Sequence, residues 1–252
     1  MLETIIVASP QLAGYVTAPA GATGLRWEEF VSPGEIAESV RRTAEGFRIP
    51  SPAAAAHLRF VNVVKAWMTP TLTGFVESVV ADLDLRGATL WTIDHVWYAY
   101  NPGPAASVND SVAAAGECLS ELIAATAAAT GLRPAPLWAQ AADLIAIACV
   151  GAGNEAYAPD EAVEVLAEVM ECLRTEAGVP IPWPHVVCGP LRRRLAFTGV
   201  PGPGECGVGD VDAEDFLSIR RLTCCHIDRS EVAATCTDCP HAPGRHSSSR
   251  GV

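Results

Sequence analysis

Four of the nine cysteines lie close together in sequence. Cys224 and Cys225 are neighbours, ten residues follow, and Cys236 and Cys239 form a Cys-x-x-Cys pair. Thiolates bind zinc and iron–sulfur clusters, and paired thiols also form disulfides. Three kinds of site are therefore open: a disulfide clip, a zinc site and an iron–sulfur cluster.

The size and composition of the chain argue against the clip. With 252 residues, half of them hydrophobic, the chain can build a large core and does not need disulfides to fold. The start, "MLETIIVASPQLAGYV", has no basic region of the kind that opens a secretory signal, and no continuous apolar run reaches the roughly 18 residues of a membrane span. The sequence thus predicts a cytoplasmic protein without a membrane span. Thiols stay reduced in the cytoplasm, so clustered cysteines there more often bind metal.

The spacing of the thiols separates the two metal readings. Adjacent residues on an extended backbone point to opposite faces, so one tetrahedral zinc could bind Cys224 and Cys225 together only if the backbone bends. A 2Fe-2S cluster has two metal ends and accepts more divergent ligands, although the spacing matches neither plant-type nor bacterial ferredoxins. A Rieske centre would need two histidines, for which His226 and His241 are available. The spacing favours iron–sulfur over zinc and leaves both open.

The full motif, Cys-Cys-x10-Cys-x2-Cys after an Arg-Arg pair and ending in Cys-Pro, resembles the C-terminal motif of FhuF-type ferric siderophore reductases. The helix "RFVNVVKAWMTPTLTGFVESVV" and the segment "APLWAQAADLIAIACV" are similar to other parts of that family in the same order. The resemblance implies a 2Fe-2S cluster bound by Cys224, Cys225, Cys236 and Cys239. It also implies one-electron reduction of a ferric siderophore, with no catalytic residue beyond the cluster.

The absence of a nucleotide-binding motif indicates an external electron donor, either a ferredoxin or a flavin/NAD(P)H-dependent reductase. The net charge of −12 argues against nucleic-acid binding and favours a neutral or cationic substrate, such as a ferric hydroxamate. Two alternatives use the same cysteines: an iron–sulfur redox sensor or electron-transfer protein, and a zinc-stapled binding module.

Basic residues gather around the cysteines. Residues 1–189 carry nine Lys plus Arg against 21 Asp plus Glu, whereas residues 190–252 carry eight of each. Arg220, Arg221 and Arg229 flank the cysteine motif, and the arginines at 192–194 can join them if the intervening chain folds back. These arginines are candidates for docking the electron donor or for tuning the cluster, and we favour docking, with Arg221 as the test residue.

Local signals place two helices in the N-terminal half. Ser32 followed by Pro33 and Glu35 predicts a capped helix start, with a capping box. A second Ser-Pro start at Ser51 predicts a helix that runs to Pro70 and resumes after a kink or break.

Aromatic and β-branched residues predict a single strand over residues 88–100, with His95 as a packed, hydrogen-bonded residue rather than a ligand. In this strand Trp91, Trp97 and Tyr100 are candidate walls of a substrate pocket, although core packing is the commoner role for any one ring. Further helices are expected at 108–130, 134–150 and 159–177.

The remaining five cysteines have no partner at metal-binding spacing. Cys118, Cys149 and Cys172 fall in helical stretches and are expected to be buried apolar thiols. Cys188 and Cys206 fall in a Pro/Gly-rich segment, and we expect a structural rather than a redox role for both.

The fold class predicted from these elements is α+β, predominantly α-helical, with a small C-terminal iron–sulfur segment. We divide the chain into a mainly helical domain, an ordered Pro/Gly-rich connection, a cluster-binding segment and a flexible tail, at residues 1–178, 179–212, 213–241 and 242–252.

Overall fold

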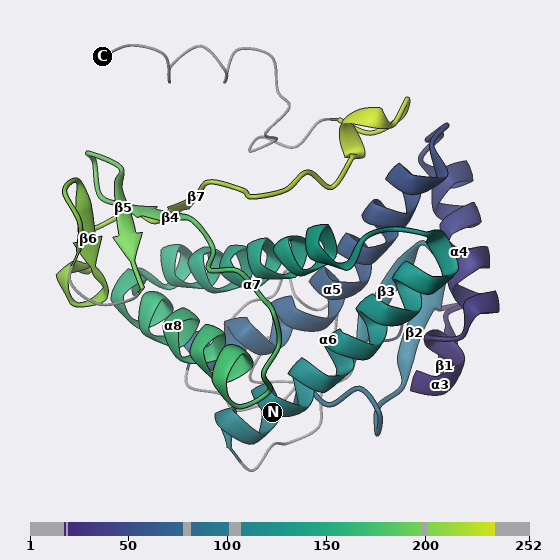
Figure 1. Ribbon diagram of the computed structural model, residues 1–252, viewed down its shortest axis with the longest axis horizontal. Coiled ribbons are helices and arrows are strands. Elements are labelled where there is room, and N and C mark those ends of the chain that lie inside the picture. Colours follow the sequence, from purple (N-terminus) through teal and green to yellow (C-terminus); the bar gives the residue numbers. More distant parts are fainter. Residues whose placement is uncertain (1–17, 19, 78–81, 101–106, 198–200, 235–252) are drawn as a thin grey trace.

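The computed structural model describes residues 18, 20–77, 82–100, 107–197 and 201–234. Cys236, Cys239, His241 and the predicted tail at 242–252 lie outside the described residues. Within the described ranges the fold is α+β and mostly helical, as predicted (Figure 1). The helices are α3 (Trp27–Phe30), α4 (Pro33–Gly46), α5 (Pro52–Val76), α6 (Val108–Thr130), α7 (Pro134–Ala156) and α8 (Pro159–Thr175), and two sheets contain β1 (Thr23–Leu25), β2 (Leu90–Ile93), β3 (Trp97–Tyr100), β4 (Val186–Cys188), β5 (Arg193–Ala196), β6 (Glu205–Gly207) and β7 (Ser218–Ile219).

Both predicted Ser-Pro helix starts are confirmed. The Ser32 hydroxyl accepts a hydrogen bond from the Glu35 amide at 3.3 Å, and Ser51 caps α5 in the same way. The Glu35 carboxylate, however, contacts the His95 ring nitrogen Nδ1 at 2.6 Å instead of turning back to the cap. The predicted capping box is therefore made on one side only, and His95 is hydrogen-bonded to Glu35, as expected of a packed, hydrogen-bonded residue.

Helix α5 is one continuous helix through Pro70, so of the predicted kink or break the break is wrong. Proline removes one backbone hydrogen bond inside a helix, and the packing of α5, which is buried over almost its whole length, offsets that loss. Figure 1 shows α5 running through the middle of the helical layer, beside α7. Its Trp67 indole N–H donates to the Leu83 carbonyl at 3.1 Å, which ties the helix to the chain before the first sheet.

The three predicted helices after residue 107 are present as α6, α7 and α8. Gly131 ends α6 in a left-handed conformation, and α7 continues six residues beyond the predicted end at 150. By length and composition alone, α6 and α7 meet the criterion for a membrane span, and 44% and 72% of their most apolar stretches are buried inside the protein. Core helices of soluble proteins meet the same criterion, so this finding is weak evidence for a membrane segment.

The predicted strand at 88–100 is instead a hairpin of β2 and β3, with β1 on its outer edge. Asp94 and His95 both adopt left-handed backbone conformations, with φ of 52° and 57°, and reverse the chain between the strands. Two consecutive left-handed residues give the type of tight turn that matches the twist of a hairpin. The sequence lacked the usual Asn-Gly or Asp-Gly signal for that turn.

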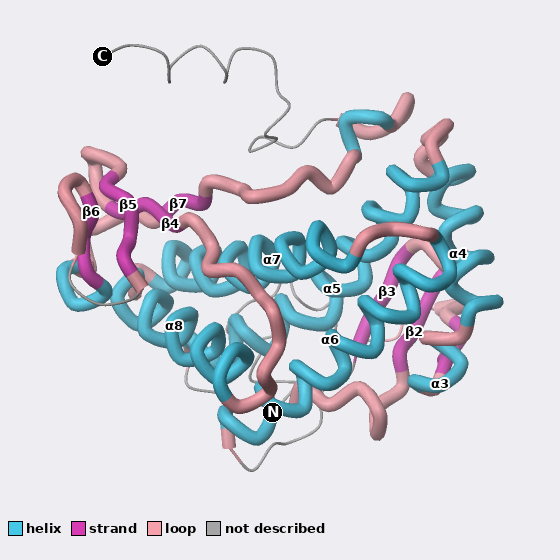
Figure 2. Tube along the Cα trace, viewed as in Figure 1, coloured by secondary structure: helices cyan, strands magenta, loops and turns pink. Residues whose placement is uncertain are grey.

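The Pro/Gly-rich connection folds into most of a second sheet, in the order β6-β5-β4-β7 (Figure 2). Strand β7, from the predicted cluster-binding segment, pairs with β4 from the connection, so this sheet crosses the predicted boundary at residue 212. Cys188 and Cys206 form a disulfide within the sheet. The sequence reading found no partner for either cysteine, because strand pairing rather than sequence spacing brings them together.

Candidate metal centre

The vicinal cysteines lie on an extended segment that leaves β7 and runs along α7 toward the start of α5 (Figure 1). Cys224 and Cys225 are buried thiols, with 7% and 6% of their surfaces exposed. The segment then turns through a short 3-10 helix, η3 (Ile227–Arg229), which contacts α5. Three helical elements therefore hold the cysteine pair.

Helix α7 anchors the backbone just before the cysteines. The fully buried Asp143 carboxylate accepts hydrogen bonds from the Leu222 amide, the Thr223 amide and the Thr223 hydroxyl at 2.9, 2.9 and 2.8 Å. One turn earlier, the buried Gln140 side chain donates to the Cys224 carbonyl at 2.8 Å. Residues three apart share one helix face, so α7 presents both groups to the same stretch of chain.

Arg221 places a positive charge near the Asp143 carboxylate and the Cys225 sulfur. Burial raises the pKa of Asp143, and its three hydrogen bonds and the positive charge of Arg221 oppose that rise. The Arg221 guanidinium also donates toward the Cys225 sulfur at 3.9 Å. Arg221 therefore lies between the Cys225 thiol and the buried Asp143 carboxylate, whose anionic form its charge favours.

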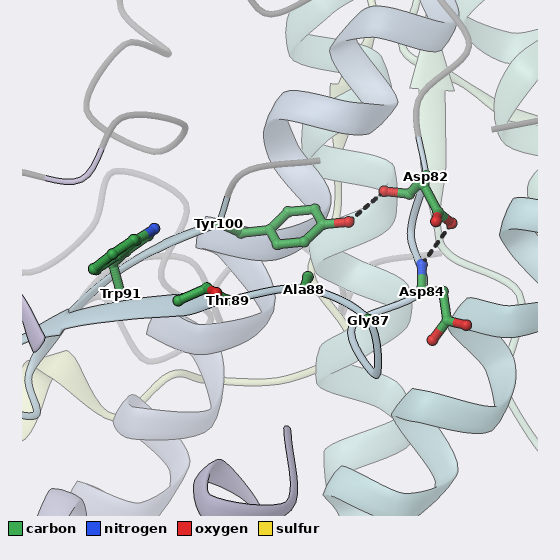
Figure 3. Close-up of a pocket in the computed structure, with 7 residues that line it drawn as sticks. All are labelled: Asp82, Asp84, Gly87, Ala88, Thr89, Trp91 and Tyr100. Carbon is green, nitrogen blue, oxygen red and sulfur yellow. Dashed lines mark hydrogen bonds between the residues drawn. The ribbon is translucent and has the colours of Figure 1, made fainter. Parts of the chain in front are cut away.

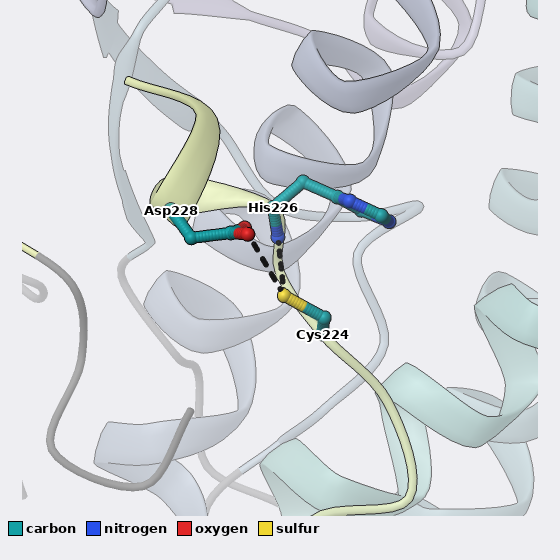
Figure 4. Close-up of side chains that lie close together, drawn as sticks. All are labelled: Cys224, His226 and Asp228. Carbon is teal, nitrogen blue, oxygen red and sulfur yellow. Dashed lines mark hydrogen bonds between the residues drawn. The ribbon is translucent and has the colours of Figure 1, made fainter. Parts of the chain in front are cut away.

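The Cys224 sulfur has different neighbours. The sulfur accepts a hydrogen bond from the His226 amide at 3.2 Å, and the thiol donates to the Asp228 carboxylate oxygen Oδ1 at 3.4 Å (Figure 4). The same sulfur therefore has both a hydrogen-bond donor and a carboxylate as neighbours. The Cys224, His226 and Asp228 ligand atoms all lie within 4.8 Å of one another.

A hydrogen-bonded chain from α5 reaches the same loop. The Gln140 side chain donates to Cys224 through its nitrogen, so its oxygen faces His57 and accepts from Nδ1 of that ring at 3.0 Å. The His57 ring also lies against the His226 ring, with centroids 4.9 Å apart. Beyond the turn, the Ser230 hydroxyl donates to the Phe47 carbonyl at 2.6 Å. The loop is thus fixed on both sides of η3.

The three flanking arginines occupy different environments. Arg221 faces Cys225, Arg229 lies 3.7 Å from Asp228, and the exposed Arg220 extends β7 through a backbone bond to the His185 carbonyl. Burial lowers the pKa of His185, and the charges of Arg194 and Arg220 lower it further. The connection therefore folds back onto β7, and the charges of Arg194 and Arg220 both act on His185.

The helical cysteines have no contact with this loop among the described interactions. Burial raises the pKa of Cys118 and Cys149 to about 12 and that of Cys172 to about 11. These thiols stay protonated at neutral pH, which agrees with the expected role of buried apolar side chains.

A pocket of about 330 Å³ lies elsewhere, and Trp91 and Tyr100 line it together with Asp82 and Asp84 (Figure 3). Trp97, the third candidate wall residue, does not line it. On α5, Trp67 bonds to Leu83, which lies between the pocket residues Asp82 and Asp84, whereas His57 lies against His226 of the cysteine loop. These positions are ten residues and about 15 Å apart along the helix. A ligand in this pocket would not touch the cysteine pair.

No protein-family model matches the chain, and no curated protein or solved structure matches it either. The resemblance to FhuF-type reductases consequently depends on the cysteine motif and on the order of the helices around it.

Sequence reasoning did not find the residues that position the cysteines. Asp143, Gln140 and His57 precede Cys224 by between 81 and 167 positions, and nothing in their spacing connects them to it. One signal was available: Asp143 is the single acid in the apolar stretch "LWAQAADLIAIACV", and an acid at such a position needs a polar partner.

Proposed function

We propose that the chain is a ferric siderophore reductase that carries a 2Fe-2S cluster on Cys224, Cys225, Cys236 and Cys239. The observation that carries this proposal is the vicinal thiol pair: two buried sulfurs on a loop that helix α7 fixes from outside, each facing a nitrogen donor. Hydrogen bonds to sulfur and restricted solvent access are features with which proteins tune such clusters.

The two sulfurs fit a cluster better than they fit one shared ion. Cys224 faces the His226 amide and Asp228, whereas Cys225 faces Arg221, four residues back along the chain. Sulfurs with such different neighbours suit a ligand set that has two metal ends.

The second pair can return to the first. Ser230 is held close to the loop by its bond to Phe47, and Cys236 follows six residues later. Six residues span up to about 20 Å, which is ample to bring Cys236 and Cys239 back to the loop.

When bound, a 2Fe-2S cluster supplies storage and release of one electron at a time. The ferric substrate gains one electron while the donor loses one, and no bond to carbon and no proton transfer is needed. Hydroxamate oxygens are hard ligands that hold Fe(III) far more firmly than Fe(II), so reduction releases the metal. The chain's own residues position the sulfurs through Asp143 and Gln140, and Arg221 offsets negative charge at Cys225.

The proposed setting is the cytoplasm, with a ferredoxin or a flavin/NAD(P)H-dependent reductase as the electron donor. Since Arg221 faces a cluster ligand, we now assign it to tuning and assign donor docking to the exposed Arg220. This revises our preference for docking at Arg221.

A steady-state assay tests the function. Protein supplied with a reductant, a ferric hydroxamate and a ferrous chelator should form the coloured ferrous chelate at a rate proportional to protein concentration. Cys236→Ser and Cys239→Ser should abolish that rate and bleach the protein, whereas Cys118→Ser and Cys172→Ser should leave both unchanged.

The same preparations separate the alternatives. About two irons and two sulfides per chain, without turnover of any ferric siderophore, would support the sensor or electron-transfer protein instead. A colourless, zinc-loaded chain from iron-replete cells would support the zinc-stapled module and contradict the proposal.

A further inference from the structure

Three different ligand types converge at the turn after the vicinal cysteines. The Cys224 sulfur, a ring nitrogen of His226 and a carboxylate oxygen of Asp228 lie within 4.8 Å of one another. Cys224 is buried, and the other two residues are half-buried, so a metal ion can reach the group from solvent. Thiolate, imidazole and carboxylate are the three side-chain ligands that zinc uses most.

The local backbone brings these residues together. His226 adopts a left-handed conformation, with φ of 60°, and η3 follows it immediately. This bend turns residues 224 and 228 toward each other, so that the Cys224 sulfur and Asp228 Oδ1 are 3.4 Å apart. A left-handed conformation is uncommon for a residue other than glycine, and such positions cluster at functional sites.

The distances are close to those of a metal site. Ligand atoms bound about 2.0–2.3 Å from a tetrahedral zinc ion lie roughly 3.5 Å from one another. The sulfur–carboxylate distance already has that value. In Figure 4 the imidazole points away from Asp228, so this ring has to turn about its side-chain bonds to close the set. Its neighbour on the other side is the His57 ring, at 4.9 Å between centroids.

We propose that Cys224, His226 and Asp228 form a mononuclear site for a divalent transition metal of the zinc class, with a further coordination position left for water or another small ligand. Three protein ligands with one open position are typical of reactive rather than purely structural zinc sites. The Cys224 thiol donates to Asp228 Oδ1 in the metal-free chain, and a bound cation would take the place of that proton between the same two atoms.

The site does not rest on the proposed function, because it uses neither Cys236 nor Cys239. It does share Cys224 with the proposed cluster, so a chain loaded with the mononuclear metal cannot carry the complete cluster. The two metal states exclude each other.

Cobalt titration of the full-length Cys236→Ser/Cys239→Ser variant, prepared reduced and metal-free, tests the site. Co²⁺ should bind one to one, with a sulfur-to-cobalt charge-transfer band and the visible bands of tetrahedral cobalt. In that background Cys224→Ser should abolish the charge-transfer band, and Cys225→Ser, its vicinal control, should retain it.

Further variants assign the other two ligands. Asp228→Asn and His226→Asn should each weaken cobalt binding about tenfold or more, and Asp212→Asn, an exposed acid elsewhere, should not change it. Asparagine is chosen at position 226 because it tolerates the left-handed backbone.

The outcomes distinguish this site from the proposed function. Absence of the charge-transfer band in the Cys236→Ser/Cys239→Ser variant, or unchanged affinity in both asparagine variants, overturns the mononuclear site. Cobalt binding as described, combined with a wild-type chain that never assembles an iron–sulfur cluster, overturns the proposed function alone.

Discussion

Asp143 is the residue whose removal should most disturb the cysteine loop while leaving the helical core in place. Its carboxylate, fully buried on α7, accepts three hydrogen bonds from Leu222 and Thr223, at 2.8–2.9 Å. In an Asp143→Ala variant, two backbone amides and one hydroxyl lose their acceptor.

The expected magnitude follows from those three bonds. A buried donor left without an acceptor costs about 1–3 kcal/mol, and the loop can limit the total cost by opening to water. We expect docking of the loop to weaken by about 3 kcal/mol, which raises the local opening constant by more than about a hundredfold. Asp143→Asn keeps one acceptor oxygen and should show an intermediate loss.

Hydrogen exchange of the backbone amides measures this opening directly, with or without bound metal. The Leu222 and Thr223 amides should exchange more than about a hundredfold faster in Asp143→Ala, while amides in the middle of α7 keep their protection. Asn154→Ala is the matched control, because the Asn154 side chain on the same helix bonds both backbone groups of Leu217. That variant should loosen Leu217 and leave Leu222 and Thr223 protected.

Two results would refute the reasoning about the anchor. One is unchanged exchange at Leu222 and Thr223 in Asp143→Ala. The other is an equal increase at these amides in Asn154→Ala, which would mean that the whole segment detaches as one unit from either anchor.

Three further predictions concern charge and the second sheet. Arg221→Gln should lower the reduction potential of the cluster, by about 40 mV for each 1 kcal/mol of lost stabilisation of the more negative reduced state. Arg220→Gln should leave the potential unchanged and flatten the salt dependence of reduction by a protein donor. A potential unmoved by Arg221→Gln would contradict the tuning role. Arg220→Gln should also raise the pKa of His185, because the variant removes one of the positive charges that lower that pKa. NMR titration of the His185 ring measures the change. An unchanged pKa would argue against Arg220 lying near His185. Replacing both Cys188 and Cys206 by Ser should lower the free energy of unfolding by about 3 kcal/mol relative to the oxidised chain, as expected for an 18-residue separation. The reduced wild type should unfold in urea at the same stability as this variant. Equal stability of the oxidised and reduced wild type would contradict a stabilising disulfide.

The helices could be predicted because their signals are local. Ser32 and Ser51 stand at the helix starts that they cap, and Gly131 stands at the left-handed end that it permits. The break offered as one alternative at Pro70 does not occur, because whether a proline interrupts a helix depends on the tertiary packing around it, which no local signal reports.

Pairings between distant segments were out of reach of the sequence. The Cys188–Cys206 disulfide depends on strand partners chosen within an irregular Pro/Gly-rich segment, and the hairpin turn at Asp94 and His95 uses residues that only occasionally adopt left-handed conformations. The candidate site divides in the same way. The proposed cysteine ligands form a spacing pattern in the sequence, whereas the anchor at Asp143 depends on how α7 lies along the loop.

The charge pattern of the sequence indicated which segment carries the arginines near the cysteines, but it did not separate the roles of Arg220 and Arg221. Arg220 and Arg221 are neighbours in sequence, and an extended backbone sends neighbouring side chains to opposite sides. One consequently lies exposed beside His185 and the other lies near Cys225.

A single-turnover experiment tests the central claim most directly. Protein is reduced chemically without oxygen, freed of reductant, and mixed with a ferric hydroxamate and a ferrous chelator, which removes Fe(II) and draws the reaction forward. The account predicts that the cluster reoxidises while one ferrous chelate forms per cluster, and that both changes have the same rate constant. A reduced cluster that persists against every ferric siderophore tested, or a ferrous chelate that forms equally fast in a Cys236→Ser variant, would contradict it.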